Sequence, residues 1–493
     1  MLFTSLEFLL LFLPATFAGF YALRAVGARR SSNSFLLVAS LAFYAYWSLA
    51  HLALLIGSIV VNFAVGRVAA GAFGAPWRRA GAVVGVVFNL SLIFWFKYLD
   101  FAASNLAAAI GADYTLRNLI LPLGISFFTF QQIAYLVDCY KNGDAERGAV
   151  RYALFVSFFP QLIAGPIVHH GHARPQYAAL GRAPVDLSML PYGLMIFAMG
   201  LAKKALIADP IARAINPVFD AAALGEAIAP LAAWGAALGY ALQIYFDFSG
   251  YCDMAIGIAL LFRVRLPVNF NSPYKATSIV DFWRRWHITL SEFLRDYVYV
   301  PHGGDGRGNA AKRGEFFRLR NVFLTMLIGG VWHGAAWTFV VWGAIHAALI
   351  TANHAARTFL PALDAANGPV AMAAKRAATL AAVVVAWVYF RADGLDAAHR
   401  VFAGMAGAAA ATGPVAVDPY VLTLGLFAGG LALFAPNSLE VAGYVADPTA
   451  PAPRPRVADF LRPTPSAALA SAVMIVGGLA VAWEPAEFIY FNF

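Results

Sequence analysis

The sequence predicts an all-α protein that crosses a membrane many times. Of its 493 residues, 61% are apolar and only 12% are charged, whereas about 25% of residues in soluble globular proteins are charged. Apolar stretches recur along the whole chain, from Ser5–Leu23 to Ala467–Ala482. Because lipid requires every backbone polar group to be paired within the protein, such stretches fold as helices. A soluble enzyme, a disordered chain and a disulfide scaffold are therefore disfavoured.

Several apolar stretches are shorter than the ~20 residues of a simple crossing, so we expect about 11 crossings, with the other stretches re-entrant or merged. We expect one integral-membrane domain over residues 1–493. Two polar loops interrupt it, a basic glycine-rich loop at 303–320 and a Pro- and Ala-rich loop at 436–466. The sequence has no visible repeat of 20–50 residues and no inverted duplication, which argues against a transporter built on inverted repeats.

The basic residues predict the orientation of the chain. Arg24, Arg29 and Arg30 follow the first apolar stretch, and Arg67 and Arg78 follow the third. Since cytoplasmic loops carry an excess of Lys and Arg, we expect the N-terminus to lie outside. The net charge of +9 comes from short clusters between apolar runs, so a nucleic-acid partner is not expected.

Cysteine and histidine spacing gives no support for a metal site. Cys139 and Cys252 lie far apart beside apolar segments, which indicates neither a disulfide framework nor a thiolate site. His169, His170 and His172 form a short run without an i, i+4 pair and without a carboxylate at ligand spacing. We therefore expect no metal.

His333 is the first candidate catalytic residue. It lies in an apolar segment with Gly330 before it and Gly334 after it, where glycines allow backbone or ligand to come close. Ionisable groups at membrane depth are costly and mark functional sites. A histidine can accept a hydroxyl proton and pass it on, which acyl transfer requires. The alternative is a packed histidine that hydrogen-bonds a neighbouring helix.

A second candidate, His287, lies in a segment that predicts an amphipathic helix over Asp281–Tyr297. Trp283, Trp286 and Leu290 recur at helical spacing on its apolar side. Such a helix near an interface can be a purely structural anchor. His287 is equally compatible with a second polar group of the site.

Polar residues also interrupt the apolar stretch around Tyr245–Met254. Asp247, Ser249 and Asp253 need buried partners there, for which Arg263, Arg265 and the arginines near 284 are candidates. We favour an architectural polar network. A Ser249–His333–Asp247 nucleophilic triad is the alternative, although the segment lacks a Gly-x-Ser-x-Gly elbow.

With these motifs in view, the chain resembles the membrane-bound O-acyltransferase (MBOAT) superfamily, and within it the bacterial branch of alginate O-acetylation membrane proteins. The resemblance extends over nearly the whole chain. The segments that carry it are Met1–Leu9, Leu121–Gln131, Phe159–Ile167, Tyr245–Tyr251, Asn269–Tyr274, Asp281–His287, Val331–Ala335 and Phe488–Phe493.

The resemblance implies a ring of membrane helices around a central tunnel, in which His333 takes the place of the family's catalytic histidine and His287 that of its second histidine. We add Asp281, Arg284 and Asn271 to the supporting polar network. His169 and His170 stand where the family has an Arg-containing sequence, so the acceptor or partner surface there is expected to differ.

The resemblance also implies an O-acetyltransferase of the bacterial inner membrane that acts on an exported, alginate-like polysaccharide. We expect no permanently bound cofactor, with acetyl-CoA or an acyl-phosphopantetheine carrier as donor. Its anionic headgroup would dock at a basic cytoplasmic rim, although positive-inside charges explain these residues equally well. The rim candidates are Lys312, Arg313, Arg318 and Arg320. Besides membrane lipid, the expected partner is a periplasmic or membrane-tethered SGNH-type acetyltransferase.

Two alternatives stay open. The first is a related enzyme of the superfamily that acts on peptidoglycan or cellulose, or that transfers D-alanine to teichoic acid. The second, less favoured, is a permease or flippase for a glycan or lipid precursor, in which His333 relays protons.

Overall fold

Helices are the only regular secondary structure in the described part of the chain. The computed structural model describes residues 1–181, 185–303, 314–408, 419–447, 449, 464–481 and 488–489. Within these ranges, helices are joined by turns and irregular segments, such as residues 112–122, and no β-strand occurs. This confirms the all-α prediction.

Among the described residues, six helices are long and apolar enough to cross a membrane. Their bounds are Glu7–Ala25, Leu49–Ala69, Ala75–Ile110, Pro230–Leu261, Trp337–Phe359 and Pro369–Arg391. Two further apolar helices, Pro419–Phe434 and Pro465–Val481, are shorter. The chain is thus a multi-pass membrane protein. The expectation of about 11 crossings stays a prediction.

The helices group into two units. Unit 1 comprises Met1–Leu201, Tyr251–Pro267 and Ser438–Pro485, and unit 2 comprises Ala202–Gly250, Val268–Asn437 and Ala486–Phe493. The expectation of one domain over residues 1–493 stays a prediction.

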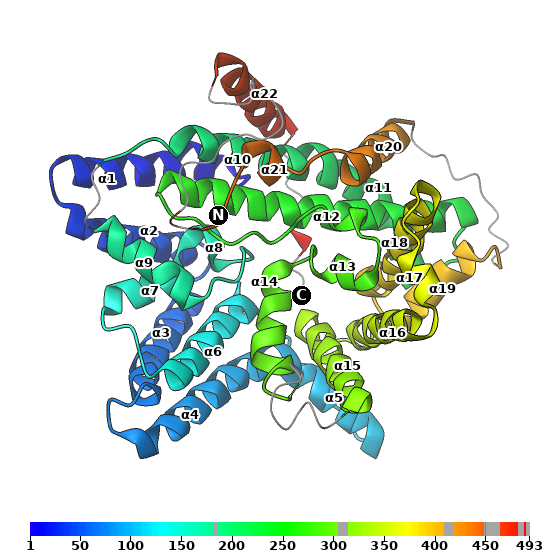
Figure 1. The fold of residues 1–493 in the computed structure, drawn as a ribbon, viewed down its shortest axis with the longest axis horizontal. Coiled ribbons are helices and arrows are strands. Elements are labelled where there is room, and N and C mark those ends of the chain that lie inside the picture. Colours follow the sequence, from blue (N-terminus) through cyan, green and yellow to red (C-terminus); the bar gives the residue numbers. More distant parts are fainter. Residues whose placement is uncertain are drawn as a thin grey trace. The chain divides into compact units, whose positions relative to one another are not determined.

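Unit 1 contains the N-terminal helices (Figure 1). Its α-helices are α1 (Leu13–Ala25), α2 (Ser32–Ala45), α3 (Leu49–Ala69), α4 (Ala75–Ile93), α5 (Leu99–Ile110), α6 (Ile125–Asn142), α7 (Ala149–Ser157), α8 (Phe159–Leu162), α9 (His170–Leu180), α10 (Leu190–Ala202), α21 (Ser438–Ala442) and α22 (Pro465–Val481). The π-helical turns Glu7–Phe12 and Phe94–Tyr98 continue into α1 and α5, and Arg29–Ser31 forms a 3-10 turn.

A polar network holds α3, α4 and α6 of unit 1 together. Asn62 and Asn89 exchange amide hydrogen bonds of 3.2 and 2.6 Å between α3 and α4. Gln132 of α6 donates to the Ser58 hydroxyl at 2.9 Å. Tyr152 of α7 donates to the Gln132 carbonyl oxygen at 3.3 Å. Buried polar groups that pair in this way fix which helix faces meet.

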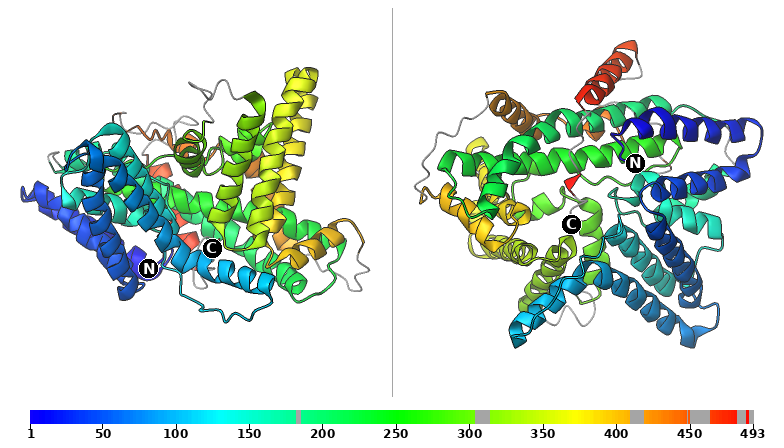
Figure 2. Two further views of the ribbon diagram at one scale, coloured as in Figure 1. Left: turned by 90° about the horizontal axis from the view of Figure 1, so that it is seen from below. Right: turned by 180° about the vertical axis from the view of Figure 1, so that it is seen from behind.

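Unit 2 contains α11 (Asp209–Ala223), α12 (Pro230–Leu261, of which residues up to 250 belong to this unit), α13 (Ile279–Trp283), α14 (Ile288–Phe293), α15 (Gly314–His333), α16 (Trp337–Phe359), α17 (Pro361–Ala365), α18 (Pro369–Arg391), α19 (Leu395–Met405) and α20 (Pro419–Phe434). Two π-helical turns, Lys203–Ala208 and Leu294–Tyr299, and the 3-10 turn Pro273–Lys275 complete it. Figure 2 gives two further views, and α16 packs against both α15 and α18.

Glycines set the close approach of α15 and α16. A Cβ on Gly330 would lie 2.4 Å from the Phe339 carbonyl oxygen and 2.9 Å from the Gly343 Cα. A Cβ on Gly334 would lie 2.1 Å from the Phe339 ring. The glycines around His333 therefore allow backbone to approach, as the sequence indicates.

The two predicted loops differ from the structure at their ends. Residues 314–320 form the first turns of α15, because Glu315–Arg320 contains no Gly or Pro. In the loop at 436–466, Ser438–Ala442 forms the short helix α21. Residues 304–313 and 450–463 lie outside the described part of the chain.

Candidate active site

His287 lies at a break between two helices. The prediction of one continuous helix over Asp281–Tyr297 is wrong, because α13 ends at Trp283 and α14 begins at Ile288. His287 has a φ of +42°, in the left-handed region that non-glycine residues rarely adopt. Such local strain persists where surrounding contacts impose it, and functional sites are a common place for it.

Asn269 supplies the contacts that hold this break. Its carbonyl side-chain oxygen accepts hydrogen bonds from the Thr289 N–H at 3.2 Å and the Thr289 hydroxyl at 2.9 Å. The same oxygen lies 3.1 Å from Nδ1 of His287. Because Oδ1 is an acceptor, Nδ1 carries the proton and Nε2 has the lone pair. Complete burial lowers the pKa of His287 to about 3, so the imidazole is neutral at pH 7.

His333 is the last residue of α15 and is buried. Its ring centroid lies 6.4 Å from that of His287. Three aromatic rings surround the His333 ring edge to face, with centroid distances of 4.9 Å for Trp332, 5.1 Å for Trp342 and 5.0 Å for Phe390. Unit 2 therefore brings the two predicted histidines together within an aromatic enclosure, a low-dielectric setting that strengthens polar interactions.

A third histidine, His346 of α16, belongs to the same enclosure and was missed from the sequence. It is fully buried, and its ring lies 4.6 Å from Trp342. Its Nδ1 accepts a hydrogen bond of 3.2 Å from the Trp283 indole. The signal was present, because His346 is also an ionisable residue within an apolar span. We call His287, His333, Trp342 and His346 the histidine cluster.

Asp247 has other partners than the predicted arginines. Lys204 Nζ lies 2.7 Å from Oδ1 of Asp247 and 2.7 Å from Oδ1 of Asp209. The second Asp247 oxygen accepts the Ile489 N–H at 3.0 Å. Lys204 is buried, with 5% of its surface exposed. A buried cation between two buried carboxylates compensates for their desolvation.

The alternative Ser249–His333–Asp247 triad is not supported by this geometry. The carboxylate that it requires is bound to Lys204. Ser249 is 2% exposed, and its hydroxyl has no hydrogen-bond partner among the residues that the structure describes. Ser249 thus lies in α12 as an isolated polar group.

Asp253 belongs to unit 1, where it accepts a hydrogen bond from the Ser438 hydroxyl. The two arginines proposed as its partners have other contacts in the same unit. Arg263 forms an ion pair of 3.0 Å with Asp186, and Arg265 donates to the Val445 carbonyl at 2.8 Å. The Ser438 hydroxyl is therefore one partner of Asp253 in this unit.

The remaining network candidates lie on the outer part of unit 2. Asp281 pairs with Arg285 at 2.9 Å, one helical turn away, while Arg284 is exposed. Asn271 is exposed too, and its side-chain oxygen accepts from Asn437 at 3.2 Å. Their predicted support of the site stays a prediction.

The donor-rim candidates lie at the start of α15 or before it. Lys312 and Arg313 are outside the described residues. Arg320 donates to the neighbouring Asn321 side chain at 2.9 Å, and Arg318 is half-buried. The 13-residue separation of Arg320 from His333 along α15 corresponds to about 20 Å. Arg318 and Arg320 therefore lie far from His333 along the helix, and their role at a donor rim stays a prediction.

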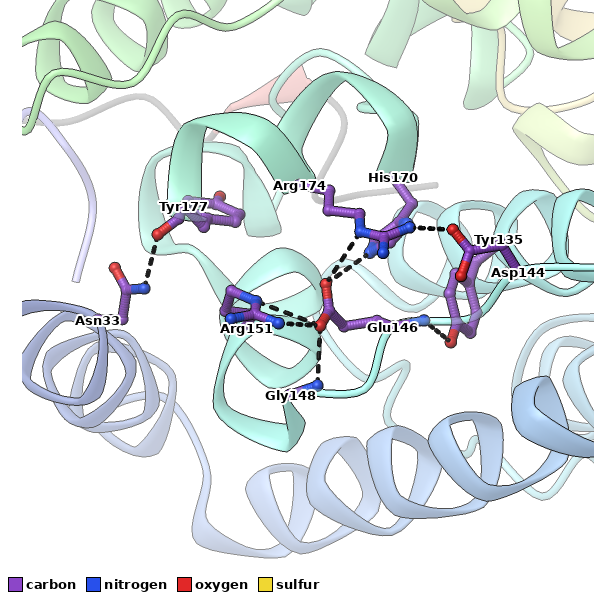
Figure 3. Close-up of polar contacts among 9 residues, drawn as sticks. All are labelled: Asn33, Tyr135, Asp144, Glu146, Gly148, Arg151, His170, Arg174 and Tyr177. Atoms are coloured by element: carbon purple, nitrogen blue, oxygen red, sulfur yellow. Dashed lines mark hydrogen bonds and ion pairs between the residues drawn. The ribbon is translucent and has the colours of Figure 1, made fainter. Parts of the chain in front are cut away.

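Of the histidines at 169–172, His170 and His172 take part in structural contacts of unit 1. Figure 3 shows those of His170. His170 Nε2 lies 3.6 Å from the buried Glu146 carboxylate. Arg151 donates to the other oxygen of Glu146 at 2.6 Å. His172 Nε2 lies 2.8 Å from the Arg265 carbonyl oxygen. The histidine run therefore does have a carboxylate near it, that of Glu146, which lies in a loop earlier in the chain. This carboxylate contacts arginine as well as histidine.

Arg174 completes this cluster by contacting both Asp144 and Glu146. Among the described residues, no group of three His, Cys, Asp or Glu side chains could hold a metal ion. Cys139 and Cys252 are both buried free thiols.

Comparison with known proteins places the chain. The MBOAT, membrane-bound O-acyltransferase family matches residues 146–390. The chain is 42% identical over 440 residues to the peptidoglycan O-acetyltransferase of Helicobacter pylori, covering 83% of this chain and 80% of that protein. It is 40% identical over 412 residues to the probable alginate O-acetylase AlgI of Azotobacter vinelandii, covering 82% and 78%. A shorter similarity, 30% over 237 residues, links it to the teichoic acid D-alanyltransferase of Bacillus subtilis, covering 48% of this chain and 59% of that protein.

The family match and the similarity to named acetyltransferases show an enzyme of the acyltransferase class, and the all-helical membrane fold agrees with it. The chain belongs to the membrane-bound O-acyltransferase family.

Proposed function

We propose that this protein moves an acetyl group from a cytoplasmic thioester donor across the membrane toward a hydroxyl of an exported polysaccharide, which it reaches through a partner acetyltransferase. His333 is the general base that takes the proton of the acceptor hydroxyl in this chain. The observation that carries the proposal is the pairing of His333 with His287, whose rings lie 6.4 Å apart in a buried aromatic enclosure. A thioester already carries its activation energy, so the site must hold the carbonyl, remove one proton and stabilise the developing charge.

The two histidines have different roles in this proposal. The low pKa of His287 makes it a poor base but leaves it a neutral imidazole with a lone pair on Nε2. His287 orients the acceptor hydroxyl through that lone pair. His333 takes the hydroxyl proton as the oxygen attacks the acyl carbon.

The donor is acetyl-CoA or an acyl-phosphopantetheine carrier, used as a substrate rather than held as a cofactor. The enzyme acts in the bacterial inner membrane with its N-terminus outside, since arginines follow its first and third apolar stretches. It takes the acetyl group on the cytoplasmic side. Delivery goes to a periplasmic or membrane-tethered SGNH-type acetyltransferase, which modifies the glycan.

The acceptor is an alginate-like polysaccharide or peptidoglycan. The similarities of 40% to an alginate O-acetylase and 42% to a peptidoglycan O-acetyltransferase, each over more than 80% of this chain, support these two acceptors equally. D-Alanyl transfer to teichoic acid is less supported, because that similarity covers 48% of the chain.

Thioester cleavage in proteoliposomes tests the proposal. The purified protein receives labelled acetyl-CoA on one side, and alginate oligomers or peptidoglycan fragments with an SGNH-type partner are supplied on the other. We expect thiol release that requires an acceptor, together with label on the glycan. Flux of a glycan without any thiol release would instead establish a permease. If an acyl-carrier thioester used in place of acetyl-CoA also gave no thiol release, acyl transfer would be excluded.

A further inference from the structure

Two polar groups of the histidine cluster are left without a role by the reaction described so far. They are the indole N–H of Trp342 and the imidazole of His346, whose side chains are 1% and 0% exposed. Trp342 lies between the two histidines, with its ring centroid 5.1 Å from His333 and 4.6 Å from His346. Trp342 is therefore next to the proposed base, and His346 is next to Trp342.

The contact of His346 with Trp283 fixes where its proton is. The Trp283 indole can only donate, and it donates to Nδ1 of His346 at 3.2 Å. Nδ1 of His346 must therefore have the lone pair. In the neutral imidazole the proton is then on Nε2, which makes Nε2 a hydrogen-bond donor.

Within the part of the chain that the structure describes, neither Nε2 of His346 nor Nε1 of Trp342 has a hydrogen-bond partner. A buried donor without an acceptor costs about 1–3 kcal/mol, so native proteins contain few of them. Two such donors cannot satisfy each other. Both donors are therefore available to an acceptor that arrives with the substrate.

We propose that Trp342 and His346 are hydrogen-bond donors to the acyl carbonyl oxygen and stabilise the oxyanion that forms on it. The inference rests on the proposed acyl-transfer function and extends it to the stabilisation of charge. As the acceptor oxygen bonds to the acyl carbon, its proton passes to His333 and the carbonyl electron pair moves onto oxygen. The C–S bond then breaks, the carbonyl re-forms, and the thiolate leaves with the proton from His333.

Neutral donors suit this task better than a cation would. Negative charge exists on the carbonyl oxygen only while the intermediate lasts, and pre-oriented donors in a dry site stabilise it without reorganisation. Carbonyl oxygen accepts two hydrogen bonds, one for each donor. The Trp283 contact keeps His346 in the required tautomer, so Trp283 is a positioning residue in this scheme.

A purely structural role makes a different prediction. Trp342 meets both histidine rings edge to face, with interplanar angles of 85° and 63°. Donors directed at ring faces would contribute to packing alone. Substitutions that remove the N–H would then change stability and leave the kinetics per folded molecule unchanged.

The variants separate the donor from the ring. Trp342→Phe keeps an aromatic ring and removes the N–H, and His346→Leu removes both nitrogens. His346→Gln keeps an acceptor for Trp283 and a donor for the carbonyl. Trp286→Phe is the matched control, since Trp286 is also 1% exposed and packs on Phe282 and Trp387 in the same unit.

Two measurements are made on each folded, monodisperse variant: the steady-state kinetics of acetyl-CoA cleavage, and the infrared carbonyl stretch of a bound ketone analogue of acetyl-CoA labelled with carbon-13. Loss of one oxyanion donor lowers kcat by roughly 100-fold in a comparable site. We expect kcat to fall by about 10- to 100-fold in Trp342→Phe and His346→Leu with KM changed by less than about threefold. We expect the carbonyl frequency to rise in both variants, and His346→Gln to recover part of kcat.

Wild-type kcat in both variants would overturn the inference. So would an unshifted carbonyl frequency, or an equal fall in kcat in Trp286→Phe, because either result would indicate packing. If Trp342→Phe fails to fold, kcat and the carbonyl frequency of His346→Leu and His346→Gln decide whether a donor at this position stabilises the oxyanion. Absence of thiol release from the wild-type protein with every acceptor would contradict the proposed function itself, which these variants do not test.

Discussion

Polar groups are buried in both units, but they are used differently. In unit 1, Asn62 and Asn89 satisfy each other between α3 and α4, and Gln132 pairs with Ser58. In the histidine cluster of unit 2, two donors have no partner within the described residues. Among the same described residues, unpaired buried groups occur in unit 1 too, such as the Tyr177 hydroxyl. Paired polar residues thus hold helices together, whereas we propose that the two donors of the histidine cluster await a substrate.

The largest expected effect on stability concerns the ion cluster of unit 2. Lys204→Met removes the cation between Asp209 and Asp247 and leaves two buried carboxylates uncompensated. Breaking a buried ion pair from one side destabilises a protein by about 3–5 kcal/mol. We expect a lower midpoint of thermal unfolding in detergent. Lys203→Met, a change in the adjacent residue, is the control, and an equal midpoint for the two variants would contradict this role of Lys204.

His287→Ala tests the catalytic side of the comparison. It removes the neutral imidazole that Asn269 orients, while His333 stays in place as the base. We expect the acyl-transfer rate to fall by roughly 10- to 100-fold, less than for loss of the base. Kinetics of acetyl-CoA cleavage measure it, and a wild-type rate would make His287 a structural residue.

The sequence predicted the all-α membrane fold, because apolar stretches have strong local signals. It also singled out the two histidines that the structure brings close together, because intramembrane ionisable groups stand out in an apolar sequence, and their catalytic role stays a prediction. It did not predict the helix break at His287. That break depends on Asn269, 18 residues earlier in the chain, whose side chain reaches His287 and Thr289. No periodicity within 281–297 reports such a contact.

Pairing of charges was harder to predict for the same reason. Asp247 was assigned to arginines that follow it in sequence, yet its partner is Lys204, 43 residues before it. Arg263 and Arg265 instead bind Asp186 and backbone carbonyls of unit 1. Partner choice depends on how helices pack, which a single sequence does not specify.

Asn89→Leu tests the structural side of the comparison. It removes both amide hydrogen bonds with Asn62 inside unit 1. Interhelical hydrogen bonds in membrane proteins contribute about 0.6 to 2 kcal/mol. We expect a loss of that size in the free energy of unfolding and an unchanged kcat per folded molecule. A fall in kcat larger than about tenfold would show that the network also serves the chemistry.

The smallest expected effect is a pH dependence of unit 1 at Glu146. Burial alone would raise the pKa of this carboxyl, but hydrogen bonds from His170, Arg151 and the backbone outweigh it. The pKa of Glu146 in the folded protein therefore lies below its usual range.

A lowered pKa stabilises the fold at every pH above the unfolded value of about 4.3, and this contribution is lost as the pH falls below it. We expect the unfolding midpoint of the wild type to fall more between about pH 5 and pH 3 than that of Glu146→Gln. Parallel curves for the two proteins would show that the cluster in Figure 3 does not control stability.

The most direct test of the central claim is acetyl-CoA cleavage by His333→Ala compared with His399→Ala, an exposed histidine of α19 in the same unit. Both variants are measured with the same acceptor and partner protein as the wild type, and the midpoint of thermal unfolding is recorded for each. The account predicts no acceptor-dependent thiol release from His333→Ala at an unchanged unfolding midpoint, and a wild-type rate from His399→Ala. Wild-type release from folded His333→Ala would contradict the assignment of the histidine cluster as the active site.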